Sequence, residues 1–376
     1  MKIETLAVHA GREPDRATGA LREPIHLSTT FERAPDGSYP HGHNYTRNSN
    51  PNRNSLEHAI TALEGGAEAV AFASGSAATL AAFSLASPGG RIVCSADCYH
   101  GTAKQLRGPL AAFGISAEFV DTSDTAAVAR ALEAPASMLW IETPSNPLLK
   151  VSDIAALSRL AHQCGALLAC DNTFASPVLQ RPFDFGADLV MHSTTKFLGG
   201  HSDVLGGVLV ARDTGPALER LRDFQSTAGG VPSPFDCWLV LRSLATLPLR
   251  VRAQSANAAA IARYLDGDRR VERAHYPGLE KHTGHALAAK QMPDGFGSVV
   301  SFQVHGGAAQ AMAVAARARL FTRATSLGGV ESLIEHRASI EGPHSQTPQN
   351  LLRLSIGIEN VSDLVADLDQ ALGTGA

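Results

Sequence analysis

The chain has 376 residues, of which 44% are hydrophobic and 18% are charged, and its formal net charge is −4. This length favours a large domain with a smaller one, and the composition is typical of a folded protein. Because no run of Lys or Arg occurs, the sequence indicates no nucleic-acid or anionic-membrane partner, and we expect a small-molecule partner. No long apolar segment or signal-peptide pattern is present, so we expect a cytoplasmic protein without a membrane span.

The first 50 residues predict an extended arm. They contain Pro24, Pro35 and Pro40 and show little helical or strand periodicity. We expect residues 1–50 to serve mainly for packing on a neighbouring subunit.

From about residue 55, short apolar runs alternate with helical patterns, which is typical of a mostly parallel sheet with crossover helices. Several runs are apolar on both faces, as a sheet covered by helices requires. The predicted strands are 67–72, 91–95, 117–120, 138–142, 166–170, 188–192 and 208–211. Residues 152–164 predict one crossover helix, because they start with an N-cap residue, carry apolar residues at helical spacing and end before Gly165.

The pattern changes after Gly229-Gly230 and two prolines. A long helical stretch is predicted from Phe235 to about Leu265, followed by fewer and shorter strands such as 298–304. We place a domain boundary near Pro232. The expected organisation is an arm over 1–50, a large domain over 51–232 and a C-terminal domain over 233–376.

The five cysteines form no CxxC pair and stand at no matched His spacing, so we expect reduced structural thiols. His41 with His43 and His282 with His285 could suggest metal ligands. No second pair stands at ligand spacing, and no metal site is predicted.

Ligands of open α/β sheets bind beyond the carboxyl ends of the strands, so the residues that follow each predicted strand are the first candidates for ligand binding. The first such place is 73–77, with the sequence Ala-Ser-Gly-Ser-Ala, where small residues let backbone N–H groups approach a phosphate. An ordinary strand-to-helix turn has the same composition. The chain contains neither GxxxxGK[ST] nor a strand-linked GxGxxG, which favours a phosphate-bearing cofactor other than a nucleotide or dinucleotide.

Two further strand ends carry chemistry. Asp171 follows the strand 166–170, where a carboxylate needs a cationic partner such as a protonated pyridine nitrogen. Lys196 follows Ser193-Thr194-Thr195 and is one of only six lysines against 26 arginines, although a surface lysine is the alternative. Together, a lysine nucleophile, an acid for a ring nitrogen and donors around a phosphate are what pyridoxal 5'-phosphate (PLP) needs.

The segment 171–207 resembles the cofactor segment of the Cys/Met-metabolism, or trans-sulfuration, family of PLP enzymes. The resemblance extends over essentially the whole chain, through further ordered motifs at 45–47, 98–99, 142–147, 326–333 and 353–355. It implies the PLP-dependent aspartate aminotransferase-like fold, called fold type I. This is an α/β fold in which the large domain binds PLP and a smaller α+β domain follows.

The resemblance also implies roles for single residues. Lys196 would hold PLP as a Schiff base, Asp171 would pair with the ring nitrogen, and Tyr99 would stack on the ring and take part in catalysis. Asn146 would lie near the phenolic oxygen. The residues expected to hold the phosphate are Gly75, Ser76, Ser193 and Thr195.

Other implied roles concern the substrate and a second subunit. Arg353 would bind the substrate α-carboxylate with help from Ser326, a task that suits the guanidinium geometry. Tyr45 and Arg47 would reach the phosphate of a neighbouring subunit, so the active site would need at least a dimer, and a dimer of dimers is expected. Thr325 stands where γ-synthases and γ-lyases of the family commonly carry a glutamate, which implies looser control of how cystathionine lies in the site.

Within the family we favour cystathionine γ-synthase, which joins an activated homoserine ester to cysteine, over a γ-lyase or β-lyase that cleaves cystathionine. A homoserine-ester sulfhydrylase and a methionine γ-lyase fit less well, the latter because His100-Gly101 follows Tyr99 where that enzyme typically has Gly-Cys. The segment 337–343 departs from the usual synthase pattern and leaves the exact substrate open. A catalytically silent scaffold and a nucleotide-dependent dehydrogenase are the alternatives outside this chemistry.

Overall fold

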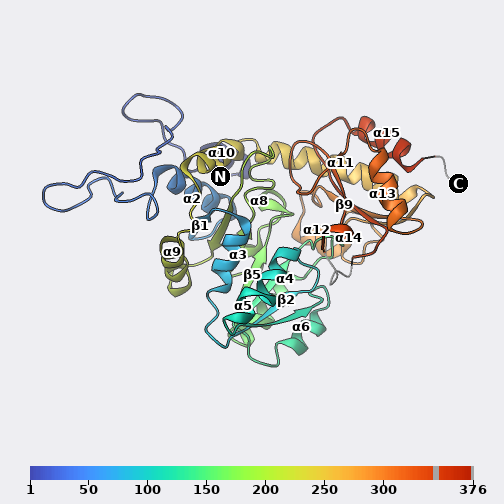
Figure 1. Ribbon diagram of the computed structural model, residues 1–376, viewed down its shortest axis with the longest axis horizontal. Coiled ribbons are helices and arrows are strands. Elements are labelled where there is room, and N and C mark those ends of the chain that lie inside the picture. The colour runs from blue at the N-terminus through green and yellow to red at the C-terminus, as the bar shows by residue number, and fades with distance from the viewer. Residues whose placement is uncertain (342–346, 374–376) are drawn as a thin grey trace.

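The chain forms two β-sheets joined by long helices, with an irregular arm at the N-terminus (Figure 1). The computed structural model describes residues 1–341 and 347–373. Residues 342 and 343, which end the segment that departs from the family's pattern, lie outside the described residues. The large sheet has seven strands and the C-terminal sheet has five, so the predicted α/β class is confirmed.

The large sheet has the strand order β1-β7-β6-β5-β4-β2-β3. All its pairings are parallel except those of β7, which runs antiparallel to both β1 and β6. All seven predicted strands are confirmed, with ends that differ by at most one residue. The bounds are β1 Glu68–Phe72, β2 Arg91–Ser95, β3 Ser116–Val120, β4 Met138–Glu142, β5 Leu167–Asp171, β6 Leu189–His192 and β7 Gly207–Ala211.

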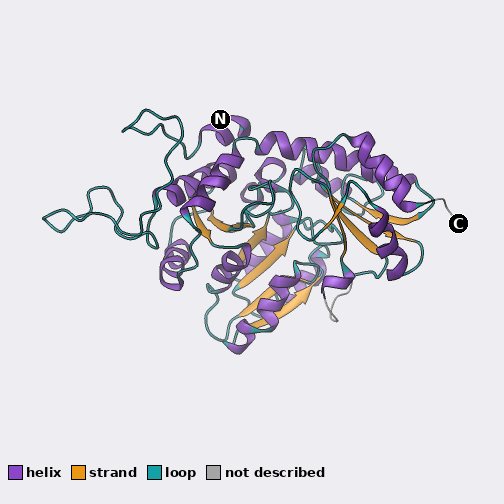
Figure 2. Ribbon diagram, turned by 45° about the horizontal axis from the view of Figure 1, so that its top comes forward, coloured by secondary structure: helices purple, strands orange, loops and turns teal. Residues whose placement is uncertain are grey.

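Helices cover both faces of this sheet, because successive side chains of its central strands point to opposite faces and are apolar on both (Figure 2). Val190 of β6 belongs to one buried cluster, while Leu189 and Met191 belong to another on the opposite face. The helices of this part are α2 Pro51–Glu64, α3 Gly75–Phe83, α4 His100–Arg107, α5 Pro109–Ala112, α6 Thr125–Ala131, α7 Ile154–Gln163, α8 Ser176–Leu179, the 3-10 helix Pro182–Phe185 and α9 Pro216–Ala228. The predicted crossover helix is α7, although its N-cap is Asp153, whose side chain accepts from Ala156 N at 2.9 Å, and not Ser152.

The C-terminal sheet has the order β10-β11-β12-β9-β8 and is antiparallel except for β10 with β11. The strands are β8 Val271–His275, β9 Val299–Val304, β10 Thr322–Arg323, β11 Leu333–His336 and β12 Leu351–Ser355. The helices that accompany it are α12 His285–Gln291, α13 Ala308–Arg317, α14 Ala338–Glu341 and α15 Val361–Leu372. The two sheets agree with the expected large and small parts, while the boundary near Pro232 stays a prediction.

The single long helix predicted from Phe235 to Leu265 is wrong. The structure has two helices there, α10 (Pro234–Leu244) and α11 (Leu247–Gly267), which are separated at Ala245 and Thr246. Pro248 lies in the first turn of α11, where its missing N–H is tolerated, whereas the same residue inside a continuous helix would remove a hydrogen bond. The proline therefore marks a helix start that the apolar periodicity does not show.

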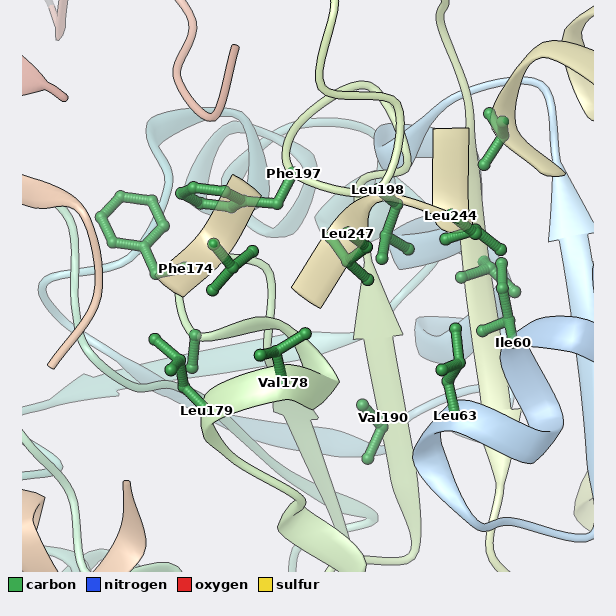
Figure 3. Close-up of a cluster of buried hydrophobic side chains, with 14 of the residues drawn as sticks. Ile60, Leu63, Phe174, Val178, Leu179, Val190, Phe197, Leu198, Leu244 and Leu247 are labelled. Carbon is green, nitrogen blue, oxygen red and sulfur yellow. The ribbon is translucent and has the colours of Figure 1, made fainter. Parts of the chain in front are cut away.

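A core cluster lies directly beneath the loop that carries Lys196 (Figure 3). It brings Ile60 and Leu63 of α2 together with Val190 of β6, and it buries Phe197 and Leu198 almost completely. These two side chains follow Lys196 in the chain and point into the core, so they fix the backbone from which the lysine extends. Burial of two such side chains stabilises this loop by roughly 3–6 kcal/mol.

The N-terminal arm contains a short helix, α1 (Ile3–His9), that the sequence did not predict. Between α1 and α2 the chain runs without regular elements apart from one bridge between Thr30 and Tyr45, and it extends away from the rest of the molecule (Figure 1). All five cysteines are free thiols. In the described part of the chain, no helix is long and apolar enough to cross a membrane and no cluster of three His, Cys, Asp or Glu side chains could hold a metal ion.

Candidate active site

A cavity of about 170 Å³ opens where the strand ends of the large sheet face the C-terminal sheet. Its walls come from the large sheet's segments after β1, β2, β4, β5 and β6, from helix α4, and from the C-terminal part's segments before and after β11 and strand β12. Nearly all the predicted site residues line it, namely Gly75, Ser76, Tyr99, Asn146, Asp171, Ser193, Thr195, Lys196, Thr325, Ser326 and Arg353. The structure therefore gathers residues that lie up to 278 positions apart (Gly75 and Arg353) into one space.

Lys196 extends into this cavity from the loop after β6. Its Nζ donates to Ser326 Oγ at 2.7 Å, across the boundary between the two sheets. Burial, followed by the positive charge of Arg353, lowers the pKa of Lys196 to about 8. An amine with that pKa is partly neutral near neutral pH and can act as a nucleophile or a base.

Ser326 is held in a strained backbone conformation, with φ at +87°, which L-residues rarely adopt. The strain places both of its oxygens at the site: the hydroxyl accepts from Lys196, and the carbonyl accepts from Arg353 Nη2 at 2.9 Å. Ser326 thus connects the lysine with the arginine.

Asp171 and Glu142 stand side by side at the ends of the paired strands β5 and β4. Burial raises the pKa of Asp171, and hydrogen bonding from Thr173 lowers it by a smaller amount. The Thr173 N–H donates to Asp171 Oδ1 at 3.0 Å. Burial, followed by repulsion from Asp171, raises the pKa of Glu142 well above its ordinary value. We take Glu142 to be the protonated partner and Asp171 to be the one that carries negative charge.

The small residues after β1 start helix α3 against the end of β6. A Cβ added at Gly75 would lie 3.0 Å from the Cβ and Oγ of Ser193, so only glycine lets the two segments approach this closely. The N-cap is Ser74, which accepts from Ala77 N at 3.1 Å. The arrangement presents a helix N-terminus and the hydroxyls of Ser193 and Thr195 to one region of the cavity, which suits a phosphate group.

Tyr99 lies immediately before α4, and the residue is 41% exposed. Its backbone N–H donates to Glu142 Oε2 at 2.7 Å, and its ring meets that of His100 edge-on at a centroid distance of 4.7 Å. The backbone is thereby anchored by the buried carboxyl, while the ring lines the cavity wall beside His100, available for stacking.

Arg353 lies in the middle of β12 and is buried. Its Nη1 donates to Asn146 Oδ1 at 3.0 Å and its Nη2 donates to Glu335 Oε2 at 2.8 Å. Its Nε is buried and has no partner among the described residues. An unsatisfied N–H on a cavity-lining arginine is suited to donate a hydrogen bond to a carboxylate ligand.

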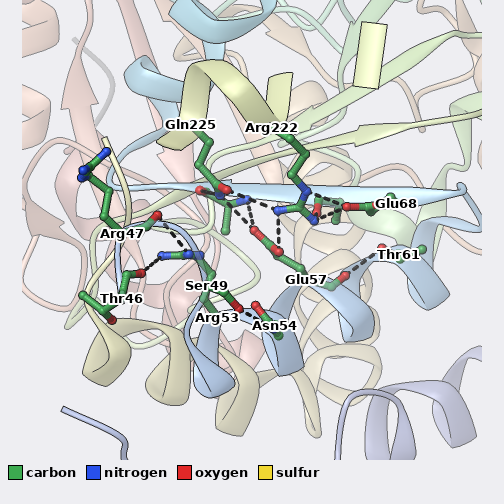
Figure 4. A network of polar contacts seen from close by, with 12 residues as sticks. Thr46, Arg47, Ser49, Arg53, Asn54, Glu57, Thr61, Glu68, Arg222 and Gln225 are labelled. Carbon is green, nitrogen blue, oxygen red and sulfur yellow. Dashed lines mark hydrogen bonds and ion pairs between the residues drawn. The ribbon is translucent and has the colours of Figure 1, made fainter. Parts of the chain in front are cut away.

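Tyr45 and Arg47 do not line the cavity. They lie on the arm, where Tyr45 is 41% exposed and the guanidinium of Arg47 lies 5.6 Å from the Tyr45 ring centroid. A polar network fastens this stretch to the body of the molecule: Arg53 donates to the carbonyl of Thr46 at 2.8 Å and to that of Arg47 at 3.2 Å (Figure 4). The two predicted phosphate ligands are therefore held in place outside the site of their own chain.

The same network continues from α2 to α9 and β1. Glu57 of α2 accepts from Arg222 Nη1 at 2.7 Å, and its other oxygen accepts from Gln225 Nε2 at 3.0 Å and from Ala71 N at 2.7 Å (Figure 4). Arg222 also pairs with Glu68. The base of the arm is thus coupled to the helix pair that flanks β1.

The residues of the cavity fit PLP. Asp171 is a buried carboxylate that makes no ion pair with any described residue, so a protonated ring nitrogen would supply the missing cation. The start of α3 offers donors to a phosphate, and Lys196 offers an amine of lowered pKa to an aldehyde. The three requirements are met by residues lining one cavity.

Two site residues were missed from the sequence. Glu142 ends the predicted strand 138–142, and the rule that gives priority to strand ends would have selected it as it selected Asp171. Arg337 lines the cavity immediately after β11, and the only sequence signal was that the segment 337–343 departs from the family's pattern.

The comparisons with known proteins agree with this geometry. The family model described as Cys/Met metabolism PLP-dependent enzyme matches residues 4–373. The cystathionine gamma-synthase of Mycobacterium tuberculosis (strain ATCC 25618 / H37Rv) is 45% identical over 375 residues, which span 98% of this chain and 96% of that protein. The cystathionine gamma-lyase of Dictyostelium discoideum is 42% identical over 381 residues, which span 99% and 97%.

Among solved structures, the cystathionine gamma synthase from Xanthomonas oryzae pv. oryzae in complex with aminoacrylate and cysteine is 42% identical. The superposition has a TM-score of 0.95 and covers 99% of this chain and 98% of that one. This likeness confirms the predicted fold over its whole length.

Proposed function

The chain belongs to the Cys/Met-metabolism family of PLP-dependent enzymes, and from that premise we propose that it joins an activated homoserine ester to cysteine, the reaction of a cystathionine γ-synthase. The observation that carries the chemistry is the meeting of Lys196, Asp171 and Arg353 in one cavity. The choice of synthesis over cleavage is supported by the synthase relative, which is 45% identical over almost the whole chain.

When bound, PLP supplies an electrophilic carbon for a substrate amine and a ring that stabilises negative charge at the substrate's α-carbon. Asp171 would hold the proton of the ring nitrogen, because a buried carboxylate without a cationic partner favours that charge. Tyr99 would stack on the ring, Asn146 would lie near the phenolic oxygen, and Ser76 with Gly75 would donate backbone N–H groups to the phosphate.

The substrate would be oriented by Arg353, whose buried Nε has no partner among the described residues and suits an α-carboxylate. Lys196 Nζ would take the proton from the α-carbon, since its pKa of about 8 matches a base that works near neutral pH. Proton movement at the β-carbon, by Lys196 with Tyr99 nearby, would then allow the γ-substituent to leave and a thiol to replace it.

The test uses the purified PLP-loaded protein, with products followed by mass spectrometry. O-acetyl- and O-succinylhomoserine are each supplied with cysteine, and cystathionine is supplied alone. We expect cystathionine to form from at least one ester faster than any 2-oxo acid appears from cystathionine. Cleavage that outruns synthesis under all conditions would overturn the assignment as a synthase.

Cleavage of cystathionine is the second candidate, because the γ-lyase relative is 42% identical over a similar length. The same cavity residues could serve either the synthesis or the cleavage of cystathionine. Thr325 bears on this choice, since it is a neutral side chain in the cavity wall. A methionine γ-lyase or sulfhydrylase activity would appear in the same assay with methionine or sulfide.

We further propose a cytoplasmic homotetramer built as a dimer of dimers, in which Tyr45 and Arg47 reach the phosphate site of a neighbouring subunit. The support is that both residues lie on an anchored arm outside their own cavity. Arg47→Ala should weaken PLP retention, measured by dialysis, and mixing it with Lys196→Ala chains should restore activity, because a hybrid dimer holds one intact site. Hybrids that form without any rescue would indicate a site complete within one chain.

A further inference from the structure

Helix α11 presents two buried polar side chains, Arg250 and Gln254, to the loops that form the cavity. Arg250 is 5% exposed and Gln254 is 0% exposed. They stand four residues apart, so they lie on one face of the helix with a rise of about 6 Å between them. Because a buried polar side chain is costly unless it is hydrogen-bonded, the contacts of these two residues show what this face of α11 holds.

Arg250 holds the loop that carries Lys196. Its Nη1 donates to the carbonyl of Phe197, the residue after the lysine, at 2.8 Å. Its Nη2 donates to the carbonyl of Ser243 at 3.0 Å and its Nε donates to Thr246 Oγ1 at 3.2 Å, so the same guanidinium also fastens the junction between α10 and α11. Burial lowers the pKa of Arg250 to about 10, which leaves the guanidinium charged at neutral pH among these uncharged acceptors.

Gln254 holds the loop that carries Ser326. Its Nε2 donates to the carbonyl of Gly329 at 2.6 Å, while its Oε1 is buried without a partner among the described residues. The same helix face therefore holds both loops, and these loops meet where Lys196 Nζ donates to Ser326 Oγ at 2.7 Å.

The two loops also pack closely against each other and against Arg250. The Val330 N–H donates to the carbonyl of Gly200 at 3.0 Å. Gly200 has a φ of +70°, and a Cβ added there would overlap Arg250 Nη1. Gly328 has a φ of +82°, and a Cβ added there would lie 2.7 Å from Phe197 N. Because these contacts leave little room, a shift of one loop is passed on to the other.

We infer that Arg250 and Gln254 are positioning residues for the reaction, which through one face of α11 set how Lys196 Nζ lies relative to Ser326. Neither side chain is among the described residues that line the cavity, so each acts through the loop that it holds. A displacement of about 1 Å at a reacting group can cost about a hundredfold in rate. The inference rests on the proposed function in one respect, namely that Lys196 takes the α-proton of the substrate.

The test follows the exchange of the α-proton of L-alanine with D2O by NMR in the PLP-loaded protein, because this step needs the base and no particular leaving group. Arg250→Met removes all the donors of a long side chain. It should slow the exchange about tenfold to a hundredfold and change the half-saturating alanine concentration by less than about threefold. Gln254→Met should slow the exchange about threefold to tenfold, since one neutral hydrogen bond is lost.

A second readout does not depend on turnover. It is the initial rate at which apoprotein becomes borohydride-fixable after PLP is added, which reports on the position of Lys196 alone. This rate should fall in the same order, with Arg250→Met slower than Gln254→Met and both slower than the wild type.

Two controls on the same helix separate positioning from a loss of stability. Arg252→Met removes an arginine whose ion pair with Glu4, at 2.5 Å, lies at the surface, and it should exchange within about twofold of the wild type. Leu265→Ala leaves a cavity in a separate buried cluster at the other end of α11. It should lower Tm at least as much as Arg250→Met does, while the exchange rate again stays within about twofold of the wild type.

Two further variants show whether the residues act together. Arg250→Lys keeps the charge and can still donate to one carbonyl, so it should exchange only about threefold to tenfold more slowly than the wild type. The double variant Arg250→Met/Gln254→Met should exchange within about threefold of Arg250→Met, because both residues serve one alignment. If Arg250→Met does not fold, Arg250→Lys and Gln254→Met carry the test.

Three outcomes would overturn the inference. Exchange that is no slower in Arg250→Met, or in Arg250→Lys and Gln254→Met, than in Leu265→Ala would leave these residues a purely structural role. Effects that multiply in the double variant would mean that the two residues do not serve one alignment. A wild-type protein that binds PLP and does not exchange the α-proton would show that Lys196 is not the base, so the failure would lie in the proposed function.

Discussion

The two sheets supply different parts of the cavity. From the large sheet come Asp171 at the end of β5 and Lys196 in the loop after β6, together with the small residues that start α3. From the C-terminal sheet come Arg353 in the middle of β12 and Arg337 just after β11. In the proposed function, the first set holds the cofactor and moves protons, while the second set recognises a carboxylate.

The two sets of residues reach the cavity in different ways. Residues at the ends of parallel strands meet at one edge whatever lies beyond it, so the cofactor half is a local product of the sheet. A mid-strand arginine such as Arg353 acts only after the second sheet has docked. Lys196 belongs to both halves, because burial and then the charge of Arg353 lower its pKa.

The largest effect is expected from Lys196→Ala, which removes the only amine in the cavity wall among the described residues. Turnover should fall by at least about a thousandfold, since both the nucleophile and the base are lost. The variant should still bind PLP through the phosphate region, measured by dialysis, while borohydride no longer fixes the cofactor to the protein. Lys281→Ala, at an exposed ion pair with Asp266, is the control. Near-normal turnover in Lys196→Ala would exclude this lysine.

Asp171→Asn should cut turnover about tenfold to a thousandfold, because a neutral amide no longer favours the proton on the ring nitrogen. The matched control is Glu142→Gln, which exchanges a carboxyl that burial keeps protonated for a neutral amide. Its effect on kcat should be much smaller. If both substitutions reduce kcat equally, the assignment of the negative charge to Asp171 is wrong.

The pH dependence of cofactor attachment tests whether burial and the charge of Arg353 lower the pKa of Lys196. Since burial lowers the pKa of Lys196 to about 8, the neutral amine increases as the pH rises toward 8 and changes little above it. The initial rate at which apoprotein becomes borohydride-fixable with PLP should rise roughly fiftyfold from pH 6 to pH 8 and then level off. Arg353→Gln should move the midpoint upward. A rate that climbs steadily to pH 10, as for an ordinary lysine, would contradict the lowered pKa.

The smallest effect concerns substrate choice at Thr325. A glutamate there would attract the distal ammonium of cystathionine with a charge-assisted contact worth roughly 1.5–3 kcal/mol, or about tenfold or more in selectivity. We expect the wild type to release pyruvate as well as 2-oxobutyrate from cystathionine, and to let cysteine compete as a substrate. Thr325→Glu should shift the ratio toward 2-oxobutyrate and reduce activity on cysteine, with Thr325→Gln as the uncharged control. A wild type that yields 2-oxobutyrate alone, with no change in Thr325→Glu, would show that this position does not set specificity.

The sequence by itself determined the large sheet and the cofactor half of the site. Continuous apolar runs bounded by small and polar residues specify buried strands, and the residues that follow them must lie at the sheet edge, which is why Asp171, Lys196 and 73–77 could be selected. Arg353, Ser326 and Tyr99 came from the family resemblance, because no local pattern distinguishes a cavity arginine from a solvated one.

Only the tertiary structure decided the rest. The break between α10 and α11 depends on a proline that apolar periodicity does not reveal, and the hydrogen bond from Lys196 to Ser326 joins residues 130 positions apart. Arg337 and Arg353 share the carboxylate of Glu335 because the paired strands β11 and β12 bring them together. Contacts between residues this far apart in the sequence leave no periodic trace in a chain, since each one depends on how whole sheets pack together.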